Sequence, residues 1–573
     1  MSVVLSEHLP LLASAPDGIK KVRGLILELA VRGKLVPQDP KDEPASELLK
    51  RIAKERARLE AEGVCRKAKQ EPKVREDEQP FSIPGNWAWV RLSVATNKIT
   101  DGTHHSPPNL PQGEFKYISA KNIKSWGVDL SGMTYVTKEI HEEIYSRCNP
   151  EFGDVLYIKD GATTGVAAVN TLTEPFSMLS SVALLKPSVG LFNRFLYFLM
   201  TSPVFYQEMR AGMTGVAITR VTLAKLNAAV LPLPPLAEQH RIVAKVDELM
   251  ALCDLLEAEQ TDATSAHAKL VETLLGTLTQ SRDADELSAN WQRLSQHFDI
   301  LFSTEASLDA LKQTILQLAV MGKLVPQDAK DEPASELGKL IAKARVKLEA
   351  AGICKKAKAS LPVNPDEYPY LLPEGWEWIR LGTLLTKIGA GSTPLGGKQG
   401  YVGEGTKFLR SQNVWNDGLR LDNVALIPPE VHLKMSGTHV EAGDLLFNIT
   451  GASIGRCAVV PESFDTGNVS QHVTIIRLVT PDIRQFMHCV LISNLVQQTV
   501  MDVQVGVSRE GLSIGKLAQF IIPFPPLAEQ HRIVAKVDEL MALCDGLKAD
   551  LAEARTRQAR LSTTLIDAAL KAA

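Results

Sequence analysis

The chain repeats itself, and this internal duplication constrains its fold more than any other feature of the sequence. Residues 234–254 read PPLAEQHRIVAKVDELMALCD, and residues 525–545 repeat all 21 positions without a change. Residues 26–69 match residues 315–358 at 33 of 44 positions. Each copy supplies the same apolar faces in the same order, so the sequence predicts two tandem units with one shared frame.

Length and composition agree with a globular protein of several domains. At about 150 residues per domain, 573 residues correspond to three or four domains. The hydrophobic fraction of 45% and the charged fraction of 23% exclude a disordered tail, a collagen-like rod and a disulfide-rich secreted scaffold. Seven Cys without a CxxC pair indicate neither a disulfide framework nor a zinc site, which favours the reducing cytoplasm. No apolar run approaches the ~18 residues of a membrane span.

Two divergent inserts separate the repeated blocks. Residues 93–232 and 382–523 share only a skeleton, in which GDVL at 153–156 matches GDLL at 443–446. Glycines recur at matching positions where turns need positive φ: Gly161 and Gly165 in the first insert, Gly451 and Gly455 in the second. Short Val, Ile, Phe and Tyr runs between turn residues predict strands. The inserts are therefore expected to be two αβ domains with one scaffold and different surfaces.

The repeated blocks carry helical periodicity. Residues 236–280 place apolar side chains in a 4-3 stagger that Gln260 and His267 interrupt: Ile242, Val246, Leu249, Cys253, Leu256, Leu270 and Leu274. The second copy has the same stagger: Ile533, Val537, Leu540, Cys544, Leu547, Leu551, Ala554, Leu561 and Leu565. Such stripes are typical of a coiled-coil seam, so we expect a long antiparallel two-helix coiled coil. Alternating Trp residues at 87 and 89, and at 376 and 378, predict a lead strand before each insert.

These patterns predict an α+β fold, with two αβ domains separated by the coiled coil and duplicated in tandem with pseudo-two-fold symmetry. The expected domains are 1–92 (N-terminal helical block and lead strand), 93–232 (first insert), 233–381 (central region), 382–524 (second insert) and 525–573 (C-terminal coiled-coil helix). Within the central region we expect the coiled-coil helix at 236–280, a second helical block at 294–360 and a lead strand.

The motifs show no convincing catalytic constellation and no metal site. GASIG at 451–455 fits the G-x-S-x-G pattern of a nucleophilic Ser453, but the other copy reads GATTG at 161–165. Glycines that are kept around an exchanged hydroxyl residue favour a structural turn. The sequence contains neither an HExxH motif nor a phosphate-binding loop. A hydrolase that uses Ser453 therefore stays only as a formal alternative.

At the motifs GKLVPQD, DEPASEL and PPLAEQHRIVAKVDELMALCD the chain resembles the specificity (S) subunit of type I restriction–modification enzymes. The likeness covers the whole chain, and the order of constant blocks and variable inserts fits. It implies that the inserts are target recognition domains that bind double-stranded DNA, and that the helices between them act as a spacer. It also implies contacts to two methylation (M) subunits and to translocating restriction (R) subunits of the phage-defence system. Catalysis, S-adenosylmethionine, ATP and Mg would belong to those partners, and this chain would carry no cofactor.

The residues support the same interpretation independently. Two near-identical frames are expected to bind two copies of one partner in a pseudo-two-fold arrangement. Two unlike inserts are expected to read two unlike half-sites, which makes an asymmetric, bipartite DNA target with the helices as a ruler.

Polar side chains on the shared skeleton are the candidate DNA contacts, because Arg pairs with guanine and Asn or Gln pairs with adenine. In the first insert they are Lys121, Asn122, Lys159, Thr163, Thr164 and Arg220. In the second insert they are Arg410, Gln412, Asn413, Asn448, Thr450, Ser453, Gln471, His472 and Arg509.

The charge of the inserts fits DNA binding less well. Residues 93–232 hold 12 Lys and Arg against 11 Asp and Glu, and residues 382–523 hold 11 of each. Phosphate affinity normally needs a basic face. Charge is therefore expected to be segregated on each insert, with many backbone contacts supplied by the partner subunits. A protein–protein scaffold with the same frame and no DNA reading is the main alternative.

Overall fold

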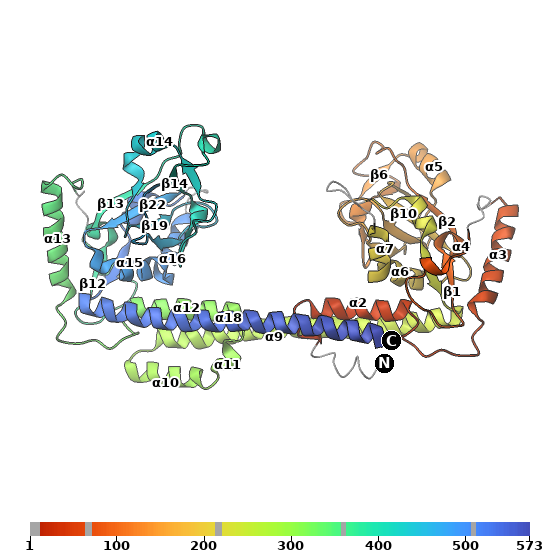
Figure 1. The fold of residues 1–573 in the computed structure, drawn as a ribbon, viewed down its shortest axis with the longest axis horizontal. Coiled ribbons are helices and arrows are strands. Elements are labelled where there is room, and N and C mark those ends of the chain that lie inside the picture. The colour runs from red at the N-terminus through yellow and green to blue at the C-terminus, as the bar shows by residue number, and fades with distance from the viewer. Residues whose placement is uncertain (1–11, 64–71, 212–219, 357–361, 506–510, 573) are drawn as a thin grey trace. The chain divides into compact units, whose positions relative to one another are not determined.

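The computed structural model describes residues 12–63, 72–211, 220–356, 362–505 and 511–572. The chain forms two compact units (Figure 1). The first comprises Met1–Ala263 with Ala554–Ala573, and the second comprises Thr264–Glu553. Both units contain helices and β-sheets, so the expected mixed fold with two tandem domains is confirmed.

Three helical segments form the base of the first unit: α2 (Gly18–Val31), the beginning of α9 (Leu236–Gln280) and the end of α18 (Leu527–Ala572). Arg23 forms an ion pair with Asp254, whereas Gln38, beyond the end of α2, donates to Glu238. The α2 and α9 segments therefore run in opposite directions. Lys21 donates to Thr563 in α18, and the apolar faces of all three segments meet in one core.

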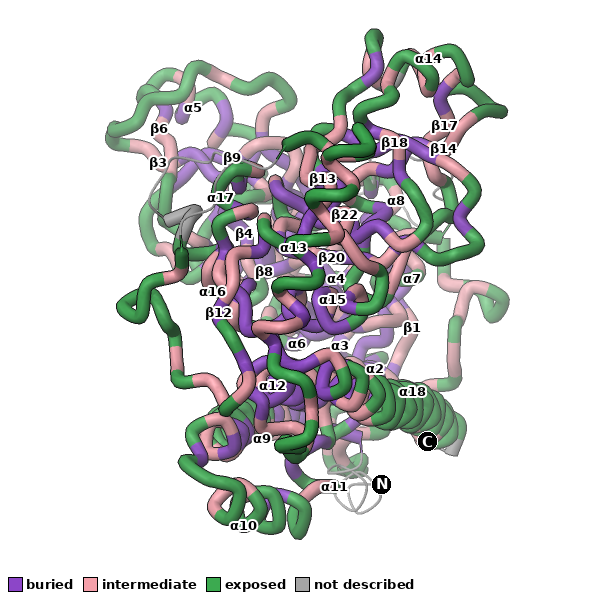
Figure 2. The backbone as a smooth tube through the Cα atoms, turned by 90° about the vertical axis from the view of Figure 1, so that its left-hand side faces the viewer, coloured by how far each residue is buried: buried purple, intermediate pink, exposed green. Residues whose placement is uncertain are grey.

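The second unit repeats this base with the long helices exchanged. It contains α12 (Glu305–Val320), the end of α9 and the beginning of α18. Lys548 pairs with Asp309, while Gln327 donates to Glu529, so α12 and α18 run antiparallel here. The remaining helices of the frame are α3 (Ala45–Ala61), α10 (Ala284–Ser295), α11 (Phe298–Leu301) and α13 (Ala334–Ala350). The segment α10 is largely exposed, as Figure 2 shows, and Asp283 caps its N-terminus through the N–H of Glu286.

A four-stranded antiparallel sheet forms the centre of the first insert, in the order β2-β10-β7-β8. Its strands are β2 (Thr96–Asp101), β10 (Val182–Pro187), β7 (Val155–Ile158) and β8 (Ala167–Val169). All four residues of β7 are buried, because the sheet is covered on both faces. A second sheet has the order β6-β3-β9, with β6 (Thr134–Val136), β3 (Phe115–Ile118) and β9 (Phe176–Met178). Flanking elements are β4 (Ile123–Lys124), β5 (Gly127–Val128), α4 (Leu92–Ala95), α5 (Lys138–Arg147), α6 (Asn193–Thr201), α7 (Pro203–Arg210) and α8 (Leu223–Ala228).

The second insert has the same strand order around its own central sheet, β13-β22-β19-β20. Its strands are β13 (Leu385–Ala390), β22 (Val473–Leu478), β19 (Leu445–Asn448) and β20 (Cys457–Val459). The second sheet gains one strand, in the order β17-β14-β21-β18, with β17 (Ala425–Ile427), β14 (Thr406–Leu409), β21 (Gly467–Val469) and β18 (His439–Val440). Flanking elements are β15 (Val414–Trp415), β16 (Gly418–Leu419), α14 (Pro429–Lys434), α15 (Arg484–Ile492), α16 (Asn494–Val505) and α17 (Ile514–Ala518).

A two-stranded ladder closes each insert at its base. In the first unit β1 (Ala88–Arg91) pairs antiparallel with β11 (Val230–Leu233). In the second unit β12 (Glu377–Arg380) pairs in the same way with β23 (Ile521–Phe524). The chain therefore enters and leaves each insert through adjacent strands, which is the geometry of an inserted module.

The expected apolar stripe of the long helices needs a correction in its second half. Beyond the polar interval of α9, the buried residues are Val271, Leu275 and Leu278, whereas Leu270 is exposed. In α18, Leu547 and Leu561 are likewise exposed, whereas Ser562 is buried and occupies the position on the helix that the apolar stripe predicts for Leu561. The distances 253–271 and 544–562 are both 18 residues, which is five turns of a straight helix with 3.6 residues per turn. A strict heptad stagger misses this register because its period is 3.5 residues.

Candidate nucleic-acid interface

Four segments of the first insert meet at the end of β7, and we call them the first loop cluster: residues 119–122, 159–164, 179–181 and 220–221. The backbone N–H of Lys159 donates to the carbonyl of Ser181 over 2.9 Å, and the N–H of Val221 donates to the carbonyl of Lys159 over 2.8 Å. The N–H of Ala120 donates to the hydroxyl of Ser181 over 3.3 Å. These bonds join turns that are far apart in sequence.

The second insert builds the matching second loop cluster from residues 410–413, 448–453, 470–472 and 511–512. The N–H of Ile449 donates to the carbonyl of His472 over 3.0 Å, and the N–H of Leu512 donates to the carbonyl of Ile449 over 2.8 Å. The amide of Asn448 donates to the carbonyl of Ser411 over 2.9 Å. The shared skeleton therefore presents the same four segments in both units.

The structure brings most of the predicted DNA contacts together in these two clusters. The first cluster contains Lys121, Asn122, Lys159, Thr163, Thr164 and Arg220, and the second contains Arg410, Gln412, Asn413, Asn448, Thr450, Ser453, Gln471 and His472. Arg509 lies outside the described residues. A side chain in a loop cluster can contact DNA only if it is accessible. The candidates therefore divide into buried and accessible side chains.

Two asparagines hold turns. The Asn122 carbonyl oxygen accepts from the N–H of Ser119 over 3.0 Å, and its amide donates to the carbonyl of Asp129. Asn413 makes the same pair of bonds, to the N–H of Arg410 and the carbonyl of Arg420. Both side chains are buried. Their polar atoms satisfy the backbone of the turn, which argues against the predicted contact with a base edge.

Three further candidates are buried for related reasons. Asn448 donates to Ser411 and to the hydroxyl of Ser453, and Thr164 donates to the carbonyl of Gly161 over 2.7 Å. Lys159 is only 2% exposed, and its ammonium nitrogen lies 2.7 Å from the Asp160 carboxylate. These three residues shape the first and second loop clusters rather than face a ligand.

The remaining candidates are accessible. Lys121, Thr163, Arg220, Gln412, Gln471 and His472 are exposed, and Arg410, Thr450 and Ser453 are partly buried. Nδ1 of His472 lies 2.6 Å from the hydroxyl of Thr450, and the guanidinium of Arg410 lies 5.7 Å from the ring centre of Tyr401. Hydrogen-bond donors of this kind, held on a rigid sheet end, suit the reading of base edges.

Residue-type reasoning missed the acidic partners of these groups. Asp101 is 1% exposed and contacts both Lys159 and Arg147, and Asp160 contacts Lys159 and Arg220. A comparison of the two copies could have pointed to Asp160. This residue follows the common GDxL strand, and the matching position of the second copy is Thr450. Trp126 was also missed: it is 72% exposed at the tip of the hairpin β4–β5, beside Lys124.

The identical PLAEQ segments have a structural explanation. We call Trp87, Gln38 and Glu238 the first clamp: the indole N–H of Trp87 and the amide of Gln38 donate to the buried Glu238 carboxylate over 2.9 and 2.6 Å. Burial raises the pKa of Glu238 above its usual value, and the hydrogen bonds from Trp87 and Gln38 oppose that shift.

The second clamp repeats the first in the other unit, with Trp376 and Gln327 donating to Glu529 over 2.9 and 3.0 Å. Burial raises the pKa of Glu529 in the same way. The clamps fasten each lead-strand segment to its long helix, so Trp87 and Trp376 serve packing.

Among the described residues, none that contacts the candidate nucleophile Ser453 forms an arrangement suited to catalysis. The hydroxyl of Ser453 accepts from the amide of Asn448, which is neither an acid nor a base, while the exposed His472 contacts Thr450. Within the described residues, no group of three His, Cys, Asp or Glu side chains is placed to hold a metal ion. None of the helices in the described part of the chain has the length and apolar character of a membrane span.

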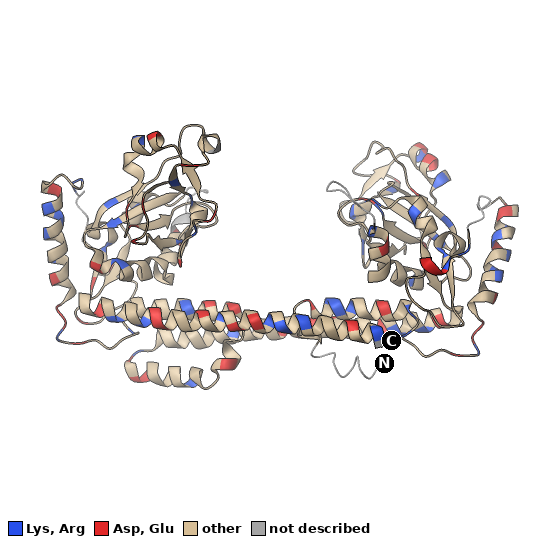
Figure 3. Cartoon of the chain, viewed as in Figure 1, with Lys and Arg blue, Asp and Glu red and all other residues tan. Residues whose placement is uncertain are grey.

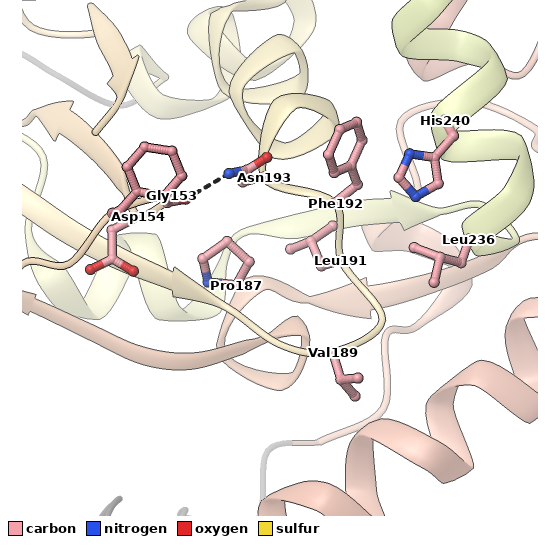
Figure 4. A pocket seen from close by; sticks show the side chains of 10 residues that line it. Gly153, Asp154, Pro187, Val189, Leu191, Phe192, Asn193, Leu236 and His240 are labelled. Carbon is pink, nitrogen blue, oxygen red and sulfur yellow. Dashed lines mark hydrogen bonds between the residues drawn. The ribbon is translucent and has the colours of Figure 1, made fainter. Parts of the chain in front are cut away.

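One cavity of about 450 Å³ lies in the first unit, between the first insert and the start of α9. Figure 4 shows Phe192 facing His240, with ring centres 4.2 Å apart, and Asn193 donating to the carbonyl of Gly153. Asp154 lines the cavity, and burial raises its pKa, although Lys186 lies 2.8 Å away and opposes the shift. The lining combines apolar side chains such as Phe152 and Leu191 with the polar groups of Asp154, Asn193 and His240.

Charge on the inserts is scattered. Figure 3 shows that Lys and Arg positions along the ribbon of each insert are interspersed with acidic and neutral ones. Several cations are also paired with carboxylates, such as Lys116 with Glu174 and Lys407 with Asp465. The segregation of charge on each insert stays a prediction.

Comparison with known proteins gives a consistent result. The family model for the type I restriction modification DNA specificity domain matches residues 97–264 and 373–554. The specificity subunit of the type I restriction enzyme EcoAI from Escherichia coli is 36% identical over 568 residues, covering 96% of this chain and 94% of that protein. The corresponding EcoEI subunit from Escherichia coli is 37% identical over 577 residues, with the same coverage. A solved structure from work on assembly and conformational transition of the type I R-M system is 18% identical, covers 86% of this chain and 99% of that chain, and has a TM-score of 0.49.

Proposed function

Because the chain belongs to the family of type I restriction–modification DNA specificity subunits, we propose that each of its inserts reads one half of an asymmetric, bipartite DNA site. The resemblance inferred from the repeated motifs is confirmed by these relatives. As a specificity subunit the chain is not itself an enzyme. In this proposal residues 93–232 and 382–524 are the two target recognition domains.

One observation carries the proposal: the same central-sheet topology presents two loop clusters of different chemistry. The first cluster exposes Arg220 beside Asp160, whereas the second exposes His472 beside Thr450. Identical scaffolds with unlike donors are what two different half-sites require, since each base pair presents its own pattern of donors and acceptors in the major groove. The proposed base contacts are the accessible residues: Lys121, Thr163, Arg220, Arg410, Gln412, Thr450, Ser453, Gln471 and His472.

We further propose that the frame docks two copies of the methylation subunit. In both copies of the 21-residue identical block, the exposed alanines are spaced by seven residues along one helix face: Ala237, Ala244 and Ala251, and again Ala528, Ala535 and Ala542. Leu252 and Leu543 extend these faces and are 40% and 60% exposed. Two exposed helix faces of identical sequence support two equal binding sites for one partner.

The long helices are proposed to pair as an antiparallel coiled coil with pseudo-two-fold symmetry, and to set the unread DNA between the half-sites. Support comes from each unit separately, because the end of one long helix packs beside the beginning of the other in both. The 45 residues of α9 span ~67 Å at 1.5 Å per residue, which exceeds one helical turn of DNA, ~34 Å.

The reactions belong to the partners in this proposal. Methylation subunits would bring S-adenosylmethionine, and restriction subunits would bring ATP and Mg and translocate DNA. Because the inserts are nearly neutral, the partners would also supply many of the phosphate contacts. The seven Cys and the absence of a CxxC pair support a cytoplasmic location.

The test is a map of methylated DNA from cells that contain the chain with its methylation subunit. The proposal predicts one motif with two unlike half-sites and a fixed spacer, and no such motif when the chain is deleted. The near-neutral inserts keep the scaffold alternative open, and that alternative predicts complex formation with no sequence preference.

A further inference from the structure

A chain of charged side chains crosses the first loop cluster from the end of β2 to the surface. Arg147, at the end of α5, lies 2.5 Å from Asp101, and Asp101 lies 3.4 Å from the ammonium of Lys159. Lys159 lies 2.7 Å from Asp160, and Asp160 lies 3.2 Å from Nε of Arg220. Charges therefore alternate in sign from a buried carboxylate to the Arg220 guanidinium.

The middle of this chain is buried at a cost in solvation. The side chains of Asp101 and Lys159 are each 2% exposed, while that of Arg220 is 60% exposed. Taking paired charges out of water is rarely a net gain in stability compared with apolar packing. A requirement for orientation explains such a chain better, because each charge fixes the position of the next.

The exposed end has the geometry of a base reader. Asp160 Oδ1 lies 3.2 Å from Nε of Arg220 as an ion pair without hydrogen-bond geometry, and within the described ranges no other group pairs with the two terminal amino groups of Arg220. The attraction of Asp160 to the Nε side of this planar guanidinium leaves its two terminal amino groups for a ligand. That edge matches the O6 and N7 acceptors of guanine, which arginine contacts in bidentate fashion.

The second insert has the same central sheet but lacks the charged residues of this chain. The positions that match Asp101, Lys159, Asp160 and Arg220 hold Ala390, Ile449, Thr450 and Gly511. A Cβ at Gly511 would lie 2.1 Å from Cγ2 of Thr450 and 2.7 Å from the carbonyl oxygen of Ile449, so no arginine fits there. The charge chain is thus specific to one insert and is not part of the common scaffold.

We propose that Arg220 reads a guanine in the half-site of the first insert, and that Asp101, Lys159 and Asp160 are positioning residues that hold its guanidinium plane. This inference rests on the proposed function and adds the base class and the device that selects it. In this proposal Lys159 is not a base contact, as its residue type predicts, but a buried residue that helps to position Arg220 through Asp160.

The experiment uses the full chain in complex with its methylation subunit. Binding is measured to duplexes in which each position of the methylated motif is substituted in turn, for the wild type and for Arg220→Gln, Asp160→Asn and Lys159→Met. Arg220→Gln should lose discrimination at one guanine of the first half-site by about 5- to 150-fold, the range of a bidentate contact, and keep it elsewhere. Asp160→Asn and Lys159→Met should lose part of the discrimination at that same base pair.

His472→Ala is the control in the other insert, because it alters an exposed side chain of the second loop cluster and should relax only the second half-site. Even weakening on all duplexes with a smaller salt dependence would assign Arg220 to a phosphate and overturn the inference. Unchanged discrimination in Arg220→Gln would overturn it as well. If Lys159→Met does not fold, Asp160→Asn decides, since it keeps the size of the side chain. A wild-type complex without sequence preference would refute the proposed function itself, which is a separate outcome.

Discussion

Replacing Trp87 by Phe should loosen the first unit and leave the second unit unchanged. The substitution removes the indole N–H that donates to Glu238 over 2.9 Å and retains an aromatic ring in the same place. Glu238 is completely buried and would keep only the hydrogen bond from Gln38. Loss of a hydrogen bond to a charged group costs about 1.5–3 kcal/mol, and the smaller ring adds roughly 1 kcal/mol through lost packing. The expected loss is therefore about 2.5–4 kcal/mol.

Hydrogen exchange resolved by peptide is the appropriate assay, because two units need not unfold in one step. In Trp87→Phe the opening free energy should fall in β1 and at the start of α9, while β12 keeps its protection. Trp376→Phe provides the matched variant, with the same loss confined to β12 and the start of α18. A loss below about 0.5 kcal/mol, the range of ordinary surface substitutions, would refute the clamp, and so would equal loosening of both units by either variant.

Three further predictions follow from the clamps, the exposed helix faces and the candidate nucleophile. The pKa values of Glu238 and Glu529 are raised, so the folded chain binds these protons more tightly than the unfolded chain, and the free energy of unfolding falls as the pH rises from the usual Glu pKa through the raised values. Replacing both residues by Gln should flatten this pH dependence of the free energy of unfolding, measured with denaturant. An unchanged pH dependence would contradict the assignment. Leu252→Asp or Leu543→Asp should each reduce the complex from two methylation subunits to one in native mass spectrometry, and retention of both would rule out these faces as docking sites. Ser453→Ala should relax discrimination only in the second half-site and retain methylation and restriction at the sites that the complex still binds, whereas loss of both activities together with normal DNA binding would revive the hydrolase alternative.

The long helix and the lead strands could be predicted from the sequence, because the spacing of apolar residues reveals both kinds of element. The helix expected at 236–280 is α9, Leu236–Gln280, since proline bounds its start and an apolar stripe runs along it. The lead strands were also found, from alternating tryptophans. The helix α10 was not expected, because only Leu294 of its twelve residues is buried and its apolar pattern is correspondingly weak.

The loop clusters were predictable in location but not in detail. Matching glycines and the GDxL strand located the turns, yet residue type does not tell whether an amide faces solvent or its own backbone. Asn122 and Asn448 point inward and satisfy turn groups, whereas Gln412 and Gln471 are exposed. The role of Lys159 depends on Asp101, which lies 58 positions earlier in the chain and meets it only through the pairing of β2, β10 and β7.

The central claim is that the two inserts are independent readers of two half-sites. It is tested most directly by exchanging residues 93–232 for the corresponding insert of a relative, between the strands β1 and β11 that close the module. Methylated DNA from cells with the hybrid and its methylation subunit is then mapped against the wild type. The account predicts one new half-site, with the other half-site and the spacer unchanged. A motif in which both half-sites change, or neither does, would contradict it.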